Sequence, residues 1–175
     1  ALRYVFCIIP EPEKEQPQYL TQEALESARA VIRLSKSPYL RILYEGWNVG
    51  ASINHLHLQG YYCEDDGMPI ENASTKEITK IEDIKIERLT DWPINSVRFD
   101  KPDTDTSLRL AFSYIDTLQS ENTAPLLMLS KHYLYIMPRR PSHPLSFSAG
   151  SGIGAVNAIG LFFAENDGVF HRLTE

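Results

Sequence analysis

The sequence has few cysteines, no long apolar run and no excess of basic charge, and each absence narrows the class of protein. Only two of the 175 residues are cysteine, Cys7 and Cys63, so no disulfide framework is implied and a reducing, cytoplasmic compartment is expected. No apolar stretch approaches the length of a membrane span. The formal net charge of -6 differs from the basic surface of most nucleic-acid-binding domains. We therefore expect neither a membrane partner nor a nucleic-acid partner.

What is present is typical of a globular domain. Hydrophobic residues make up 43% of the chain, which is enough for a core, and 175 residues fit one domain. Apolar residues at helical spacing predict two main helices, over residues 21–35 with Thr21 as N-cap and over residues 106–119 with Thr106 or Ser107 as N-cap.

Short runs rich in β-branched and aromatic residues predict strands between turn signals. They cover residues 4–9, 40–44, 50–62, 94–99, 126–129, 133–137 and 158–163, of which the first is expected to be buried. Residues 69–86 have a mixed pattern, whose isoleucines would cover a sheet edge or face. Short strand-to-strand connections favour antiparallel pairing. The expected fold class is therefore α+β, an antiparallel sheet with two main helices on one face.

The most informative stretch alternates polar and apolar side chains: His55, Leu56, His57, Leu58 and Gln59. Period two is the period of a strand, so the polar residues would share one face and the leucines the other. Residues on one face stand roughly 6–7 Å apart, which allows three polar groups to follow one phosphate chain. The leucine face can then be buried.

This polar row fits phosphoryl chemistry. Neutral imidazole is a good nucleophile near pH 7 and can form a covalent intermediate, and His57 is the central residue of the row. Gln59 could donate a hydrogen bond to a phosphoryl oxygen, and His55 could fix the geometry or contact the leaving group. The spacing alone leaves two other interpretations open, a metal-binding pair or satisfied polar residues of a half-buried strand. Zinc usually takes three or four ligands, and no further ligand pair lies close in sequence.

Two further stretches are candidates for phosphate contacts. The turn over residues 45–50 contains glycines, which let backbone N–H groups approach an anion, although an ordinary hairpin turn explains them equally well. Arg139 and Arg140 stand together at a predicted strand end. Such a pair can clamp a phosphate or a carboxylate, and it can also be plain surface charge.

The histidine stretch carries a family resemblance. Residues 50–52 (Gly-Ala-Ser) followed by residues 55–59 (His-Leu-His-Leu-Gln) resemble the active-site strand of the histidine-triad and galactose-1-phosphate uridylyltransferase superfamily. The resemblance is to the transferase and phosphorylase branches, where glutamine replaces the third histidine of the hydrolases.

Two longer comparisons extend this resemblance over most of the chain. Residues 39–44, 54–62 and 68–73 resemble the GDP-hexose phosphorylases, whose substrates are GDP-L-galactose or GDP-D-glucose. Residues 126–140 and 155–160 resemble the C-terminal part of diadenosine tetraphosphate phosphorylases, also called ATP adenylyltransferases. Nothing in the histidine motif itself selects the substrate.

The resemblance implies roles for individual residues. His57 would be the nucleophile that takes up a nucleoside monophosphate, and Gln59 would bind and orient its phosphate. His55 would support His57, partly through its main-chain carbonyl, and Ser52 would contact phosphate. These are expectations carried over position by position.

One position departs from the family pattern. The GDP-hexose phosphorylases have asparagine where this chain has Glu45, near the ribose and phosphates. A carboxylate there would repel the substrate, so either Asn48 takes over this function or the nucleotide binds differently. The incoming acceptor is expected near Arg139 and Arg140.

The resulting hypothesis is a single histidine-triad-like nucleotidyltransferase domain over residues 1–175. The chain begins without methionine and directly on a predicted strand, so a truncated N-terminus is expected. It would be a nucleotidyltransferase or phosphorylase acting on a nucleotide sugar or dinucleoside polyphosphate through a covalent nucleotidyl-His57 intermediate. Inorganic phosphate or a sugar phosphate would be the acceptor. No cofactor and no metal site are expected, with Mg²⁺ optional.

Two alternatives remain open at this point. One is a nucleotide hydrolase of the same fold, in which water is the acceptor. The other is a non-catalytic nucleotide-binding domain, which Glu45 and the short N-terminus favour. The oligomeric state is also open, a homodimer being one option.

Overall fold

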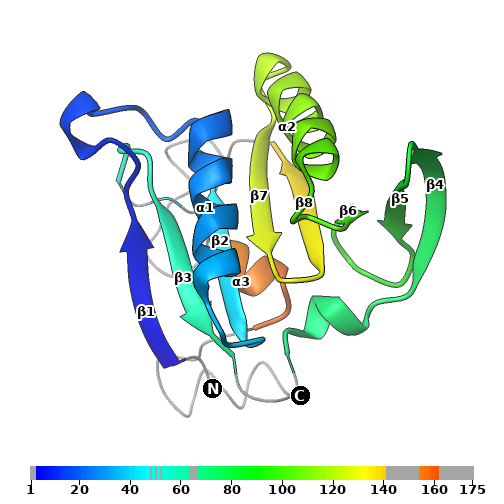
Figure 1. Ribbon diagram of the computed structural model, residues 1–175. Coiled ribbons are helices and arrows are strands. Elements are labelled where there is room, and N and C mark those ends of the chain that lie inside the picture. The colour runs from blue at the N-terminus through cyan, green and yellow to red at the C-terminus, as the bar shows by residue number, and fades with distance from the viewer. Residues whose placement is uncertain are drawn as a thin grey trace, which may run out of the picture.

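The computed structural model describes residues 3–47, 49, 51, 53–63, 67–140 and 154–161. These residues form an eight-stranded antiparallel sheet with two main helices, which confirms the predicted fold class (Figure 1). The strands are β1 (Arg3–Ile8), β2 (Leu40–Glu45), β3 (Leu58–Tyr62), β4 (Thr75–Ile81), β5 (Ile84–Leu89), β6 (Val97–Asp100), β7 (Ala124–Leu129) and β8 (Tyr133–Arg139). The helices are α1 (Gln22–Leu34), α2 (Asp105–Ser120) and α3 (Ala155–Ala158), with single 3₁₀ turns η1 (Pro12–Lys14) and η2 (Pro69–Asn72).

The strand order across the sheet is β1-β3-β2-β7-β8-β6-β5-β4. Strands β2, β7 and β8 are central, and β1 and β4 form the two edges. The strand that follows the histidines, β3, therefore lies between edge strand β1 and central strand β2. This position leaves the segment just before β3 close to the end of β2.

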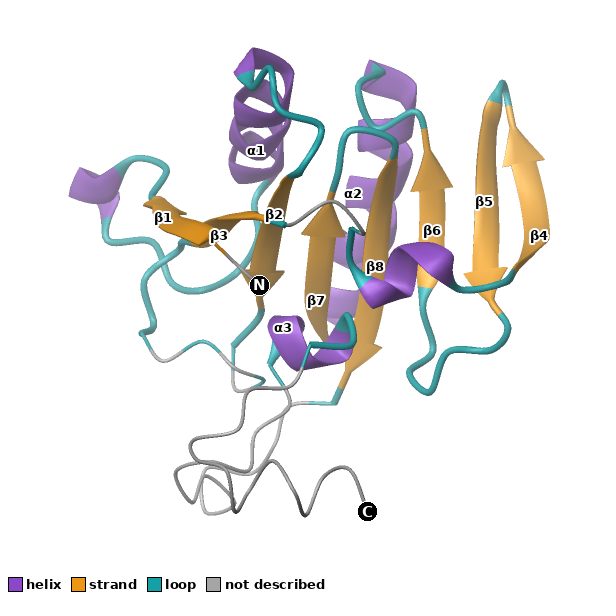
Figure 2. Cartoon of the chain, turned by 90° about the horizontal axis from the view of Figure 1, so that it is seen from below, coloured by secondary structure: helices purple, strands orange, loops and turns teal. Residues whose placement is uncertain are grey.

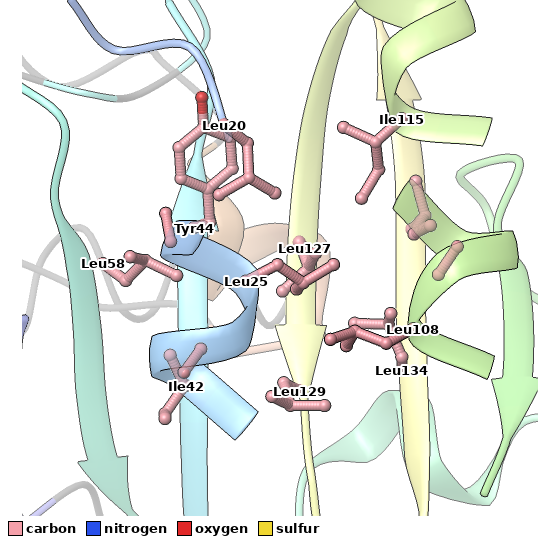
Figure 3. Close-up of a cluster of buried hydrophobic side chains, with 14 of the residues drawn as sticks. Leu20, Leu25, Ile42, Tyr44, Leu58, Leu108, Ile115, Leu127, Leu129 and Leu134 are labelled. Atoms are coloured by element: carbon pink, nitrogen blue, oxygen red, sulfur yellow. The ribbon is translucent and has the colours of Figure 1, made fainter. Parts of the chain in front are cut away.

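The two long helices cover the same face of the sheet, as predicted (Figure 1). Their apolar stripes meet side chains of β2, β7 and β8 in a closed hydrophobic cluster (Figure 3). The residues labelled there are Leu20, Leu25, Ile42, Tyr44, Leu58, Leu108, Ile115, Leu127, Leu129 and Leu134. A fully buried leucine stabilises a fold by about 1.5–3 kcal/mol, so this face supplies much of the stability.

The helix starts follow from side-chain capping. The Thr21 side chain accepts the N–H of Ala24 at 3.2 Å, which confirms the predicted start of α1. The second helix begins earlier than predicted, because Thr104 is the N-cap and accepts the N–H of Ser107. Ser107 cannot cap a helix here, since its hydroxyl is buried and donates to the carbonyl of Asp100 at 2.6 Å.

The opposite face of the sheet is covered by short elements, η2 and α3 (Figure 2). Buried apolar residues of β2, β7 and β8 also form a cluster on this side, which includes Leu43, Leu126 and Met137. The prediction of a strand over residues 158–163 is wrong for residues 158–161, which end α3 and turn away from it, and residues 162–163 lie outside the described part. The helical bonds of this segment, from the N–H groups of Ala158 and Ile159, are met locally rather than by a neighbouring strand.

Two other strand predictions need correction. Residues 4–9 are not a buried strand, because β1 is an edge strand whose Val5 is 59% exposed. The strand predicted over residues 94–99 begins only at Val97. The Ser96 hydroxyl donates to the carbonyl of Ile94, and this local turn holds the chain out of the ladder.

Residues 69–86, left without an assigned element by the sequence pattern, contain η2 and the start of a β-hairpin. Strands β4 and β5 pair directly, and Glu82 has a φ of 55° in the two-residue turn between them. In the described part of the chain, no helix is both long and apolar enough to cross a membrane.

Candidate active site

The two histidines precede strand β3 instead of lying on it. The strand begins at Leu58, and the ladder between β2 and β3 ends at the pair Leu43 and Gln59. The prediction of one continuous strand over residues 50–62 is therefore wrong. The physical reason is that the backbone N–H of His57 donates to a side chain, the Oε1 atom of Gln18, at 3.0 Å, and not to a neighbouring strand.

The predicted alternation of faces is nevertheless present. Leu56 and Leu58 are completely buried, whereas His55, His57 and Gln59 are only partly buried. The segment keeps this alternation because the N–H of Leu56 donates to a carbonyl of the 16–18 segment, which runs beside it. The polar row thus reaches the surface while the leucines anchor it.

The imidazole of His57 is held by its own chain. Its Nδ1 atom lies 2.8 Å from the carbonyl oxygen of His55. A carbonyl can only accept, so Nδ1 carries the proton and Nε2 carries the lone pair. Among the described residues, no group of three or more His, Cys, Asp and Glu side chains is arranged to hold a metal ion. The contact between the two histidines uses the backbone carbonyl of His55, and the supporting role expected from the resemblance stays a prediction.

Gln59 is oriented by a neighbour that the sequence analysis did not single out. Tyr61, two residues along β3 on the same face, donates its hydroxyl hydrogen to Oε1 of Gln59. The Nε2 group is thereby turned to the other side, where it can donate. Burial raises the pKa of Tyr61, and the negative charge of Glu45 adds to the rise. The period of two between Gln59 and Tyr61 was a usable signal for this contact.

Glu45, the position that departs from the family pattern, makes a structural hydrogen bond. Its Oε1 atom accepts the backbone N–H of Ala155, the first residue of α3, at 2.6 Å. Burial raises the pKa of the Glu45 carboxyl, and the hydrogen bond from the Ala155 N–H and the electrostatic interaction with the nearby His57 partly oppose the rise. A Cβ atom on Gly154 would stand 2.4 Å from Oε1, so a larger residue there would displace the Glu45 carboxylate from this position. Glu45 therefore ties the end of β2 to α3.

Gln18 is the second residue that sequence reasoning missed. It lies in the proline- and glutamate-rich stretch over residues 11–18, which has the composition of a solvated loop. Its side chain is nevertheless buried and bonded to the backbone of His57 and of Glu45. No local pattern distinguishes Gln18 from its polar neighbours, so this role could not be predicted from the sequence.

The predicted arginine pair lies at the same end of the sheet as the histidines. Register connects Glu45 to Leu126 and Leu126 to Met137, and Arg139 follows two residues later on the same face. Three strand spacings separate β3 from β8, which is roughly 14 Å. Arg139 is partly buried and Arg140 is exposed. The structure thus brings the arginines to the site's end of the sheet without direct contact with the histidines.

Two predicted site residues, Asn48 and Ser52, lie outside the described residues. Among the described residues, the rings of Tyr19 and Trp47 stack with centroids 4.1 Å apart and planes 12° apart. They line a hollow of about 320 Å³ together with other residues of the same segments, including Asn54. This hollow adjoins the candidate site through Gln18, which lines it as well.

A larger hollow, of about 790 Å³, lies between α1, the start of α2 and the turn after β7. It includes Leu129 and Ser130, at the opposite end of β7 from Leu126. None of the candidate site residues lines it. Size alone therefore does not identify the functional site of this chain.

Several known proteins are similar to this chain. Residues 3–61 match the family described as GDPGP1-like, N-terminal domain. The chain is 31% identical over 132 residues to GDP-D-glucose phosphorylase 1 of Danio rerio, covering 74% of this chain and 38% of the relative. It is 34% identical over 94 residues to GDP-L-galactose phosphorylase 1 of Arabidopsis thaliana, covering 53% and 21%.

The fold is also that of a solved structure. The yeast Ap4A phosphorylase Apa2 in complex with Ap4A superposes with a TM-score of 0.71 at 15% identity, covering 97% of this chain and 64% of that one. The chain thus spans less than two thirds of each of these proteins. The sequence matches point to one family, and the superposition shows the fold.

Proposed function

The chain belongs to the GDP-hexose phosphorylase family of GDPGP1-like proteins, with a histidine-triad-like fold, and from this premise we propose that it is a phosphorylase-type nucleotidyltransferase. In the first step Nε2 of His57 attacks the α-phosphorus of the donor. An N–P bond forms and the bond between that phosphorus and the bridging oxygen breaks, releasing a sugar phosphate or a nucleotide. In the second step an oxygen of the acceptor attacks the same phosphorus and frees His57.

The observation that carries the proposal is the state of the His57 ring. Because Nδ1 donates its hydrogen to the carbonyl oxygen of His55, 2.8 Å away, the lone pair is fixed on Nε2, where a nucleophile needs it. A fixed tautomer and a fixed ring plane also reduce the entropy lost on reaching the transition state.

Gln59 supplies the donor for the developing charge. Its Oε1 atom is engaged by Tyr61, so its Nε2 hydrogens are directed away from Tyr61 and can bind a phosphoryl oxygen. A preorganised donor of this kind acts without carrying a titrating proton to the site. Tyr61 is therefore part of the proposed machinery through Gln59.

The proposed donors are a nucleotide sugar or a dinucleoside polyphosphate. Relatives are named for GDP-D-glucose and GDP-L-galactose, and Apa2 for Ap4A. The hollow beside Tyr19 and Trp47 offers aromatic surface for a base. The proposed binding residues for the acceptor, inorganic phosphate or a sugar phosphate, are Arg139 and Arg140 at the end of β8, which lies three strand spacings, roughly 14 Å, from β3.

Phosphorolysis with separate donors tests this proposal. The purified chain is incubated with GDP-glucose, UDP-glucose, ADP-glucose or diadenosine tetraphosphate, with and without inorganic phosphate, and the nucleotides are separated by chromatography. We expect a nucleoside diphosphate only when phosphate is present, and no product from the His57→Ala variant. The matched control is His132→Ala, which removes an exposed histidine in the turn after β7.

Each other outcome has a defined meaning. Nucleoside monophosphate formed equally without phosphate would identify a hydrolase of the same fold and refute the transferase proposal. Donor binding without any product would support a non-catalytic nucleotide-binding domain. Equal activity of His57→Ala and wild type would exclude His57 as the nucleophile.

A further inference from the structure

The side chain of Gln18 lies between the end of β2 and the segment that carries the histidines. It is 1% exposed. Its Oε1 atom accepts the N–H of His57 at 3.0 Å, and its Nε2 group donates to the carbonyl of His57 at 3.0 Å and to the carbonyl of Glu45 at 2.8 Å. Both amide hydrogens and the amide oxygen are therefore committed to backbone groups around His57.

Gln18 is itself held in place by two backbone contacts. Its N–H donates to Oδ1 of Asn54 at 3.0 Å, and its carbonyl accepts the hydroxyl hydrogen of Tyr44 at 2.8 Å. Tyr44 is 1% exposed in the core under α1, and burial raises the pKa of its phenol. Gln18 thus connects the histidine segment to the rigid core through hydrogen bonds.

The side-chain amide of Gln18 takes the place of backbone pairing between β2 and β3. The pairing of β2 with β3 ends at Leu43 and Gln59, and the same register continued two residues further would pair Glu45 with His57. A primary amide presents the same donor and acceptor as a peptide group, so Gln18 can bridge these two residues where the strands no longer touch. His57 receives both of its backbone bonds from this one side chain.

We propose that Gln18 is a positioning residue for His57, which fixes the backbone of the nucleophile by acting as a side-chain substitute for the lost β2–β3 pairing. The proposal rests on the function proposed above. Without the amide, the His57 N–H and carbonyl would lose their partners, and the ring would no longer be held at one distance from the α-phosphorus. A displacement of about 1 Å can slow a reaction roughly 100-fold.

The chain contains a matched control for the purely structural effect. Gln119 of α2 binds the N–H and the carbonyl of Leu20 at 2.9 and 3.1 Å, in the same two-bond manner. Leu20 is two residues from Gln18. Both glutamines therefore connect the segment around residues 18–20 to another part of the chain, each through side-chain amide bonds to backbone groups. Only Gln18 also binds His57. Gln18→Met and Gln119→Met each remove such an amide while keeping a similar side-chain volume.

The experiment measures the rate of nucleotide transfer to His57 in a single turnover, against donor concentration, by rapid quenching and intact-protein mass. We expect Gln18→Met to lower the saturating rate about 10- to 100-fold with little change in the half-saturating donor concentration. Gln119→Met should stay within about twofold of wild type at a temperature where both variants are folded. Equal rates for the two variants would overturn the proposal.

A second readout does not depend on catalysis. Hydrogen exchange of the His57 amide, followed by NMR, should be protected in wild type and in Gln119→Met and unprotected in Gln18→Met. Continued protection in Gln18→Met would also overturn the proposal. If wild type forms no adduct with any donor, the proposed function fails, whereas the exchange result still decides whether Gln18 fixes His57.

Discussion

The two faces of the sheet differ in what they bury. The face under α1 and α2 closes over an almost entirely apolar cluster, in which the hydroxyl of Tyr44 donates to the carbonyl of Gln18 (Figure 3). The opposite face buries polar groups among its apolar residues, including Arg41, Glu45 and Tyr61. Polar groups can be buried only where hydrogen-bond partners are supplied.

The short elements of the second face supply those partners. The start of α3 gives the Ala155 N–H to Glu45, and Glu71 of η2 pairs with Arg41 at 2.9 Å. Long regular helices bond their own backbone groups internally and have few to offer in the middle of their length. The long helices therefore cover the apolar core, whereas the short elements supply hydrogen-bond partners to the polar groups of the other face.

Two adjacent leucines of β7 would test this comparison most strongly. Leu127 packs under the helices and Leu126 packs on the opposite face beside Glu45, and both are 0% exposed. Leu127→Ala and Leu126→Ala should each lower the free energy of unfolding by about 2–5 kcal/mol, measured by urea denaturation.

The two variants should differ in activity. At a temperature where both are folded, Leu126→Ala should slow nucleotide transfer to His57 about tenfold, because the site rests on it, and Leu127→Ala should leave the rate nearly unchanged. Equal loss of activity in both variants would contradict the division between the two faces.

A smaller effect is expected from the hydroxyl of Tyr61. Tyr61→Phe keeps the ring and removes the donor to Gln59, so the amide can rotate and the transfer rate should fall about tenfold. Loss of a transition-state donor itself costs roughly 10²–10³-fold. The control is Tyr114→Phe, which alters a partly buried ring on the helix-covered side. Equal rates for Tyr61→Phe and wild type would show that Gln59 does not depend on this contact.

The partly buried carboxyl of Glu45 predicts a pH dependence of stability. Burial raises its folded pKa above the ordinary value of 4.5, so above that pH the folded state keeps a proton that the unfolded state has released. This contribution to stability is complete below the unfolded pKa and is lost as pH rises through the folded pKa. Urea denaturation between about pH 4 and pH 7 should show a weaker decline in Glu45→Gln than in wild type.

Glu77→Gln, which changes an exposed carboxyl of β4, is the control for this series. It should follow the wild-type decline. The account of Glu45 would be wrong if the Glu45→Gln and wild-type profiles were parallel throughout this range.

The smallest effect is expected from the side chain of His55. Its main-chain carbonyl makes the contact with Nδ1 of His57, and alanine has the same carbonyl. His55→Ala should therefore change the transfer rate by no more than about threefold. A loss as complete as that of His57→Ala would show that the His55 imidazole itself takes part.

The sequence allowed the regular part of the fold to be predicted, because burial and periodicity coincide there. Helix α1 and the β7–β8 hairpin follow their apolar patterns and their caps. The β4–β5 hairpin was missed because β4 is almost entirely exposed and carries no burial pattern. The segment over residues 158–161 is apolar in the manner of a strand, yet its surroundings favour a single helical turn.

The candidate site was predictable only where its residues are close in sequence. His55, His57 and Gln59 form a row that period two identifies, and their burial follows it. The contacts that fix this row come from far along the chain, since Gln18 is 39 residues from His57 and Ala155 is 110 residues from Glu45. Contacts at such separations depend on the strand order, which no local pattern specifies.

The most direct test of the central claim is the mass of the intact protein after brief exposure to each donor without phosphate. The account predicts an added nucleoside monophosphate on wild type, located at His57 by peptide mapping, absent from His57→Ala and removed when phosphate is added. Measurable binding of the donors without any added mass on the wild-type protein would contradict it.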